Sequence, residues 1–263
     1  MAFSVNTNLG ALQAYNALAK VNADTQAAQV RLATNKRINS AADDTSGWNI
    51  GKQLEAANLT MKSQLANISS AKNFLDTAQS ALAQIFDKLN EIAAKQNDSA
   101  DPLKDASALQ GDVKTLADEI SSILSNTTIN GTDLLASASN SFSAGGSADV
   151  DVNIGAEIGD NSTALEALQE GDEDSLTTDI ADFQDNIRAA ITYIGNTYQT
   201  LDSREQFITS ALANNEAAVS RLFDADMASE QLSNTKGQVA GQIATAMFSQ
   251  MNAAPQQVLA LFR

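Results

Sequence analysis

Residues 180–222 have the sequence IADFQDNIRAAITYIGNTYQTLDSREQFITSALANNEAAVSRL. Apolar residues recur in it at alternating steps of three and four, the pattern of a helix face that packs along its length against other helices. No proline interrupts this pattern, so the sequence predicts one long helix. An ordinary helical bundle would show the same periodicity and stays open as an alternative. The predicted face consists of Ile180, Phe183, Ile187, Ala190, Ile194, Tyr198, Leu201, Ile208, Leu212, Val219 and Leu222.

The same periodicity occurs twice in the first half of the chain. It runs from Ala11 to Leu32 and again from Leu54 to Ile92. Asp101-Pro102 should end the second helix, because proline disfavours a helical conformation in the residue before it. A shorter helix is predicted for residues 103–125. Together these segments predict a mainly α fold, an elongated rod of long antiparallel, coiled-coil-like helices.

The middle of the chain has a different texture. Asn130-Gly131 is a turn signal, and the apolar residues from Val150 to Ile158 alternate with polar ones. This alternation predicts a half-buried strand in a small β-hairpin. The chain should therefore go out as helices, turn back through a β segment and return as helices, which pairs its N- and C-terminal helices.

Composition restricts the chemistry of the chain. Its 263 residues include no Cys and no His, which excludes disulfides, zinc sites built on those residues and histidine acid-base catalysis. No combination of nucleophile, base and orienting group is visible, so we expect no enzymatic activity, no metal and no cofactor. A calcium site at Asp172, Asp174 and Asp179 is the one alternative to the expectation of no metal. It is disfavoured because the run lacks the glycine at the turn of an EF-hand loop.

The net charge of −16 is unevenly spread. Residues 115–187 contain 15 Asp and Glu and no Lys or Arg, which leaves −1 for the remainder of the chain. Such a segment should repel nucleic acid and anionic membranes, and a solvated face is its simplest explanation. We expect neither a Sec-type signal peptide nor a transmembrane helix, since no basic and apolar leader and no long apolar run is present.

Both ends of the chain lack charge. Residues 1–19 and 237–262 contain no charged side chain and are rich in Ala, Gln, Asn, Leu and Met. Chain ends are normally where disorder and tolerance to change concentrate. The absence of charge instead indicates helical surfaces that are covered in the working protein. Their many Gln and Asn residues make them too polar to span a membrane, so we expect other protein to cover them.

Motifs near both ends resemble those of bacterial flagellins. The amino-terminal one comprises Arg31-Leu32, residues 37–44 (RINSAADD), Gly47 and Ile50, with Asn35 where flagellins commonly have Gly. The carboxy-terminal ones are residues 220–228 (SRLFDADMA) and 252–261 (NAAPQQVLAL). This resemblance covers nearly all of residues 1–135 and 178–263. It implies a structural subunit that is exported unfolded through the flagellar type III apparatus, without a cleavable signal peptide. Outside the cell it would self-polymerise into the flagellar filament for swimming motility.

The resemblance also implies three parts. Residues 1–40 with 225–263 would be terminal filament-core helices, and residues 41–136 with 178–224 an inner rod domain. Residues 137–177 would be a short acidic β and loop segment in place of the outer domains of larger flagellins. Some flagellins hold a zinc protease in that insertion, but its HExxH site cannot exist in a chain without His.

Several residues are candidates for contacts with other proteins. Charged residues of the motifs would contact neighbouring subunits, with ordinary surface ion pairs as the alternative: Arg31, Arg37, Asp43, Asp44, Arg221, Asp224 and Asp226. The segment with Lys88, Glu91 and Ile92, together with Asp112, resembles the flagellin region that the innate immune receptor TLR5 senses. Lys88 stands in place of an Arg whose planar fork it cannot reproduce, so we expect weakened sensing. Candidate O-glycosylation positions are Ser137, Ser139, Ser141 and Ser143.

Partners implied by the resemblance are copies of the chain itself, hook-associated and cap proteins, and an export chaperone at the C-terminal helix. Two alternatives stay open. A hook-filament junction protein would share both termini but occupy a single ring, and a secreted coiled-coil binding protein would not polymerise.

Overall fold

The computed structural model describes residues 9–135, 140–145, 149–159 and 161–261, and in the last helix the side chains as far as Met251. Two candidate glycosylation positions, Ser137 and Ser139, lie outside the described residues. The chain forms two compact units. We call Met1–Asn58 with Asn214–Arg263 the terminal unit, and Leu59–Ala213 the central unit.

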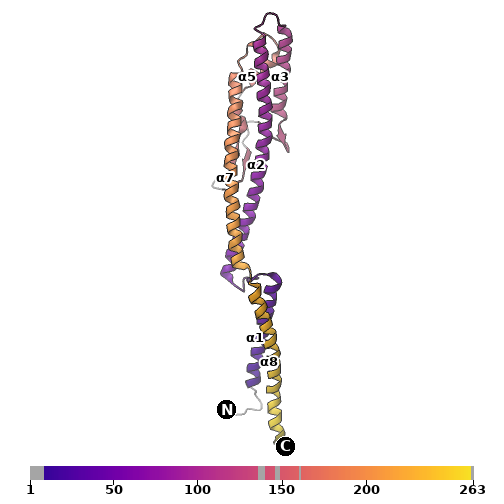
Figure 1. The fold of residues 1–263 in the computed structure, drawn as a ribbon, viewed down its shortest axis with the longest axis vertical. Helices are drawn as coiled ribbons and strands as arrows, with labels where there is room; N and C mark the ends of the chain where they lie inside the picture. Colours follow the sequence, from indigo (N-terminus) through magenta and orange to yellow (C-terminus); the bar gives the residue numbers. More distant parts are fainter. Residues whose placement is uncertain (1–8, 136–139, 146–148, 160, 262–263) are drawn as a thin grey trace. The chain divides into compact units, whose positions relative to one another are not determined.

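Long helices dominate the fold, as Figure 1 shows. They are α1 (Leu9–Thr34), α2 (Thr45–Asp98), α3 (Ala106–Asn126), α7 (Ala181–Phe223) and α8 (Met227–Leu261). Short elements lie between α3 and α7: β1 (Thr128–Ile129), β2 (Thr132–Asp133), β3 (Asn140–Phe142), β4 (Val150–Val152), α4 (Ile154–Ile158), α5 (Ser162–Glu170) and α6 (Glu173–Thr177). The predicted mainly α fold is confirmed.

In the central unit, α2 and α7 pack antiparallel. Lys72 forms ion pairs with Asp202 and Glu205, and farther along α2 the amide of Asn90 accepts a hydrogen bond of 3.2 Å from Gln184. Residue numbers thus rise along one helix as they fall along the other. The helices meet through the faces that the periodicity predicted. The fully buried side chains of these faces include Leu75, Leu82, Leu89, Ile92, Ile187, Ala190, Ile194 and Leu201.

The third helix begins later than predicted. The side chain of Asp105 accepts hydrogen bonds from the backbone N–H groups of Ser107 (3.0 Å) and Ala108 (3.4 Å) and so caps α3. Leu103 lies before this cap and is 93% exposed. Val113, Ala117 and Ile120 of α3 complete the core against α2.

The strand predicted to reach Ile158 is shorter than expected. β4 pairs antiparallel with β3, which confirms the hairpin, but it ends at Val152. The side chain of Asn153 accepts a hydrogen bond from the N–H of Ala156 (3.1 Å) and caps α4. Ile154 and Ile158 are both buried, because residues four apart share a helix face just as alternate residues share a strand face.

The acidic residues considered for calcium have local structural roles. Asp172 caps α6 by accepting a hydrogen bond from the N–H of Asp174 (2.9 Å), and Asp179 does the same for Ala181 at the start of α7. In the described ranges no group of three or more acidic side chains could hold a metal ion. Nor is any helix of those ranges long and apolar enough to cross a membrane.

The buried face of α2 gives a first testable prediction. Replacing Leu82, which is fully buried, with Ala should lower the free energy of unfolding by about 2–5 kcal/mol, because it leaves a cavity in the core. Leu59 lies on the same helix but is 71% exposed, so Leu59→Ala should change that free energy by less than about 0.5 kcal/mol. Urea unfolding followed by circular dichroism measures both. Equal losses in the two variants would contradict this placement of Leu82.

Candidate assembly surface of the terminal helices

In the terminal unit, α1 and α8 form an antiparallel pair. Arg31 forms an ion pair of 3.4 Å with Glu230, Thr25 lies against Gly237, and the rings of Tyr15 and Phe248 are 6.5 Å apart. Figure 1 accordingly shows the start of α1 and the end of α8 at the same end of this pair. The predicted pairing of the N- and C-terminal helices is confirmed.

Small residues bring these two helices close together. A Cβ atom added at Gly237 would lie 2.2 Å from Oγ1 of Thr25, closer than real side chains approach. On α1 the buried positions are Ala11 and Ala28. The contact is therefore a narrow seam that covers only one side of each helix.

A second apolar face of α8 is left uncovered. Its exposed large side chains recur at steps of seven, four and four and form what we call the outer stripe: Leu232, Val239, Ile243 and Met247. Only Lys236 interrupts the stripe with a charge. With 3.6 residues per turn, the stripe lies about a third of a turn around the helix from the half-buried seam. The half-buried seam residues of α8 are Glu230, Asn234, Gly237, Ala240, Gly241, Ala244 and Phe248.

The loop between α1 and α2 is tied to the junction of α7 and α8. The backbone N–H of Arg37 donates to the carbonyl of Phe223 (2.6 Å), and that of Ala225 donates to the carbonyl of Asn35 (3.1 Å). Asn35 has a φ of 57°, a left-handed conformation that Asn accepts more readily than other residues with a side chain.

Phe223 anchors this connection. Its side chain is buried, and the ring of Trp48 meets it edge-on at 5.9 Å. A Cβ atom at Gly51 would lie 2.1 Å from the Phe223 ring, so α2 needs glycine at this position. Sequence reasoning placed Phe223 in the motif of residues 220–228 but missed its packing role, because its partners Gly51 and Trp48 are far away in the sequence.

The three basic candidates for subunit contacts all have partners within the chain. Besides the Arg31–Glu230 ion pair, the guanidinium of Arg37 donates to the carbonyl of Leu222 (3.0 Å), and Nε of Arg221 donates to the carbonyl of Ala217 (3.2 Å). Their role in contacts between subunits stays a prediction. To bind a neighbouring subunit, each arginine would have to keep or give up its partner within the chain.

The four acidic candidates hold turns and helix ends. Oδ2 of Asp43 accepts the N–H groups of Asn39 (3.0 Å) and Ser40 (2.9 Å), and these hydrogen bonds lower the pKa of Asp43. The remaining three act in the same local way: Asp44 accepts from the N–H of Gly47, Asp224 from the hydroxyl of Ser220, and Asp226 from the N–H of Ala228. Their contribution to subunit contacts is likewise still a prediction.

The segment resembling the innate-receptor region is only partly on the surface. Ile92 is fully buried, in agreement with its place at the end of the periodic apolar face from Leu54 to Ile92, and the role of this segment in sensing stays a prediction. The ammonium of Lys88 lies 3.1 Å from Glu119, and this interaction raises the pKa of Lys88. Asp112 pairs with Lys95 at 2.5 Å.

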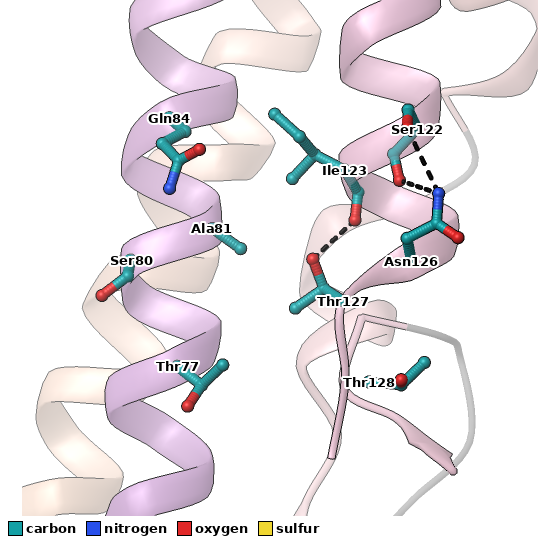
Figure 2. Close-up of a pocket in the computed structure, with 9 residues that line it drawn as sticks. All are labelled: Thr77, Ser80, Ala81, Gln84, Ser122, Ile123, Asn126, Thr127 and Thr128. Atoms are coloured by element: carbon teal, nitrogen blue, oxygen red, sulfur yellow. Dashed lines mark hydrogen bonds between the residues drawn. The ribbon is translucent and has the colours of Figure 1, made fainter. Parts of the chain in front are cut away.

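The pocket in Figure 2 lies in the central unit between α2 and the end of α3. Its volume is about 410 Å³, and its lining has hydroxyl, amide and apolar groups but no charged side chain. The hydroxyls of Thr77 and Ser80 donate to carbonyls of their own helix, both at 2.9 Å. Without a titratable group, this pocket offers nothing for acid-base catalysis.

Two of the glycosylation candidates, Ser141 and Ser143, lie within the described ranges. Both are exposed, and their modification stays a prediction.

The close approach of α1 and α8 can be tested with two glycines of α8. Gly237→Ala should weaken the pairing by about 1–3 kcal/mol, because the new methyl group must displace Thr25. Gly241→Ala is the matched control: the nearest atom to its Cβ would be 3.7 Å away, so the gain in helix propensity should prevail. Amide hydrogen exchange across both helices should accelerate only in Gly237→Ala. Equal exchange in both variants would mean that the helices are less closely packed.

Comparison with known proteins agrees with this arrangement. Residues 5–140 match the bacterial flagellin N-terminal helical region, and residues 177–262 match the bacterial flagellin C-terminal helical region. Similar proteins include the flagellar filament 33 kDa core protein of Treponema phagedenis (28% identity) and the flagellins of Halalkalibacterium halodurans and Bacillus subtilis (26% each). Each match spans 98% of this chain and 99% of the relative. The two matched regions cover most of the sequence and contain the paired helices α1 and α8, so the chain belongs to the bacterial flagellin family.

Proposed function

We propose that this flagellin is a structural subunit that polymerises with identical copies into the bacterial flagellar filament and serves swimming motility. The name of the Treponema phagedenis relative describes a filament core protein, and the flagellin matches extend over nearly the whole chain. A structural role needs no catalytic group. It needs surfaces that recognise other copies of the chain.

The observation that carries this proposal is the outer stripe of α8. Burial of apolar surface contributes roughly 25 cal/mol per Å², and contiguous exposed apolar patches on soluble proteins mark interaction sites. In the single chain Leu232, Val239 and Ile243 are each at least 50% exposed. A neighbouring subunit that covers the stripe would stabilise both the contact and the helix itself.

The placement of the stripe favours an open polymer. One side of α8 is already occupied by α1, so a neighbour must bind on a different side. When such a contact joins two different surfaces of identical copies, it repeats from subunit to subunit and forms a helical filament unless the rotation closes a ring. Exposed apolar residues on α1, which include Leu9, Leu12 and Val30, provide a second surface for that contact.

Further roles follow from family membership and are part of the proposal. The subunit would act outside the cell after unfolded export through the flagellar type III apparatus. It would contact hook-associated and cap proteins in the flagellum, and an export chaperone would bind α8 beforehand. Recognition by the innate receptor would use the segment with Lys88, Glu91 and Ile92, together with Asp112; of these only Ile92 is fully buried.

A substitution in the outer stripe tests self-assembly. Ile243→Asp should abolish filaments or raise the critical concentration, the free subunit left when growth stops, by more than about tenfold. An unpaired carboxylate would then be buried between subunits, which costs several kcal/mol, and about 1.4 kcal/mol corresponds to a factor of ten. Sedimentation and electron microscopy of the purified full-length chain measure both outcomes.

Ile243→Met is the matched control for this test. It keeps the position apolar and should polymerise like the wild type. Wild-type assembly by Ile243→Asp would show that subunits do not bury the stripe. The wild type also separates the alternatives: long filaments of the chain alone exclude a junction protein confined to one ring, and their absence under all conditions would favour a binding protein.

A further inference from the structure

A pocket of about 390 Å³ lies in the terminal unit, where the start of α2 meets the loop before it and the end of α7. Its apolar side chains are Ile38, Trp48 and Phe223. Ile38 and Phe223 are each only 1% exposed, so the apolar part of the pocket lies deep. Concave sites with an apolar lining and a few polar groups are typical binding sites. We call this one the Trp48 pocket.

The charged lining of the Trp48 pocket is net positive. Nζ of Lys52 lies 4.9 Å from the centre of the Trp48 ring, and Nζ of Lys36 lies 5.5 Å from the centre of the Phe223 ring. Glu55 pairs with Lys52 at 2.7 Å and with Lys36 at 3.8 Å, and the hydrogen bond from Lys52 lowers the pKa of Glu55. One carboxylate therefore faces two ammonium groups. Both lysine side chains are about half exposed, so a further anionic group can reach them.

The loop between α2 and α3 has the complementary character (Figure 1). Its Leu103 is 93% exposed, more than any other large apolar side chain in the described part of the chain. Three aspartates, Asp98, Asp101 and Asp105, flank this leucine, and Lys104 is the one basic residue among them. Oδ1 of Asp101 accepts the N–H of Leu103 (3.0 Å), and the carbonyl of Asp101 accepts the N–H of Lys104 (3.0 Å). A hydrogen-bonded, acidic turn thus presents Leu103 to solvent.

We propose that Leu103 of one copy of this chain binds in the Trp48 pocket of another copy, with the aspartates of its loop beside Lys36 and Lys52. This inference rests on the proposed filament function. The leucine would fill the apolar part of the pocket while opposite charges meet around it. Leu103 is exposed in its own chain, so the pocket that covers it belongs to a second copy. Because loop and pocket are different surfaces, the contact can repeat from subunit to subunit in an open polymer.

Both surfaces are ordered before they meet. The Trp48 ring packs edge-on against Phe223 at 5.9 Å, and two hydrogen bonds hold the turn at Leu103. Binding therefore loses less conformational entropy than it would with flexible partners. Tryptophan in a pocket is also among the residues that contribute most to binding between proteins.

Disulfide cross-linking tests the contact, because the chain has no Cys of its own. One variant carries Leu103→Cys, and a second carries Thr34→Cys in the lining of the Trp48 pocket. Mixed filaments of the two variants should form disulfide-linked dimers under mild oxidation, and filaments of either variant alone should not. Non-reducing gel electrophoresis measures this. Leu59→Cys is the matched control: it replaces another exposed leucine of the central unit, and mixed with Thr34→Cys it should give no dimers.

The critical concentration measures what the contact contributes. Leu103→Asp should raise it by about tenfold or more, because the burial of a leucine side chain is lost. Leu103→Met keeps an apolar side chain and should assemble like the wild type. Neither change should disturb the fold, since Leu103 is exposed.

Two results would overturn this inference alone: mixed filaments of Leu103→Cys and Thr34→Cys that yield no dimers, or wild-type assembly by Leu103→Asp. Failure of the wild type to form any filament would overturn the proposed filament function as well.

Discussion

Each half of this chain depends on the other for the partner that buries its apolar helix faces. In the central unit α2 packs antiparallel on α7, and in the terminal unit α1 packs antiparallel on α8. Most of the stability of a helix in a protein comes from such packing, since its own hydrogen bonds are marginal in water. Neither half can therefore form its long helices stably without the other, and the turn through the short middle elements is what allows them to meet.

The two helix pairs leave different surfaces to solvent. Large side chains such as Leu82 and Ile194 fill the contact between α2 and α7, whereas Gly237 and Ala28 mark the contact between α1 and α8. Because small residues suffice for the second contact, the larger apolar residues of α8 lie on another side of the helix. The charge has the complementary distribution. The terminal unit contains eight basic and eight acidic residues and has no net charge, whereas the central unit contains eight basic and 24 acidic residues and carries the whole −16. One unit is thus suited to packing against copies, and the other to facing water.

Sequence reasoning succeeded where a pattern had one structural meaning and failed where it had two. Steps of three and four predicted the buried face of α7 from Ile180 to Ile208, where only Tyr198 is partly exposed, whereas Leu212, Val219 and Leu222 farther along are only partly buried. Ile154 and Ile158 fit both a strand and a helix, and the cap formed by Asn153 decided for the helix. The burial of Ile92 agrees with its predicted place on the periodic face that contains Leu89. Local periodicity was a good guide because burial follows from it directly.

From the order of residues alone, the long helices, their apolar faces, the uncharged ends and the family resemblance follow, since each is encoded within a short stretch of chain. The pairing of Phe223 with Gly51 and Trp48, the partners of Arg37 and Asp226, and the uncovered side of α8 emerge only in three dimensions. The same holds for the separation of charge, because it depends on where the folded chain divides into units. These features require residues far apart in sequence to meet, and no local pattern specifies which distant partner a helix face will find.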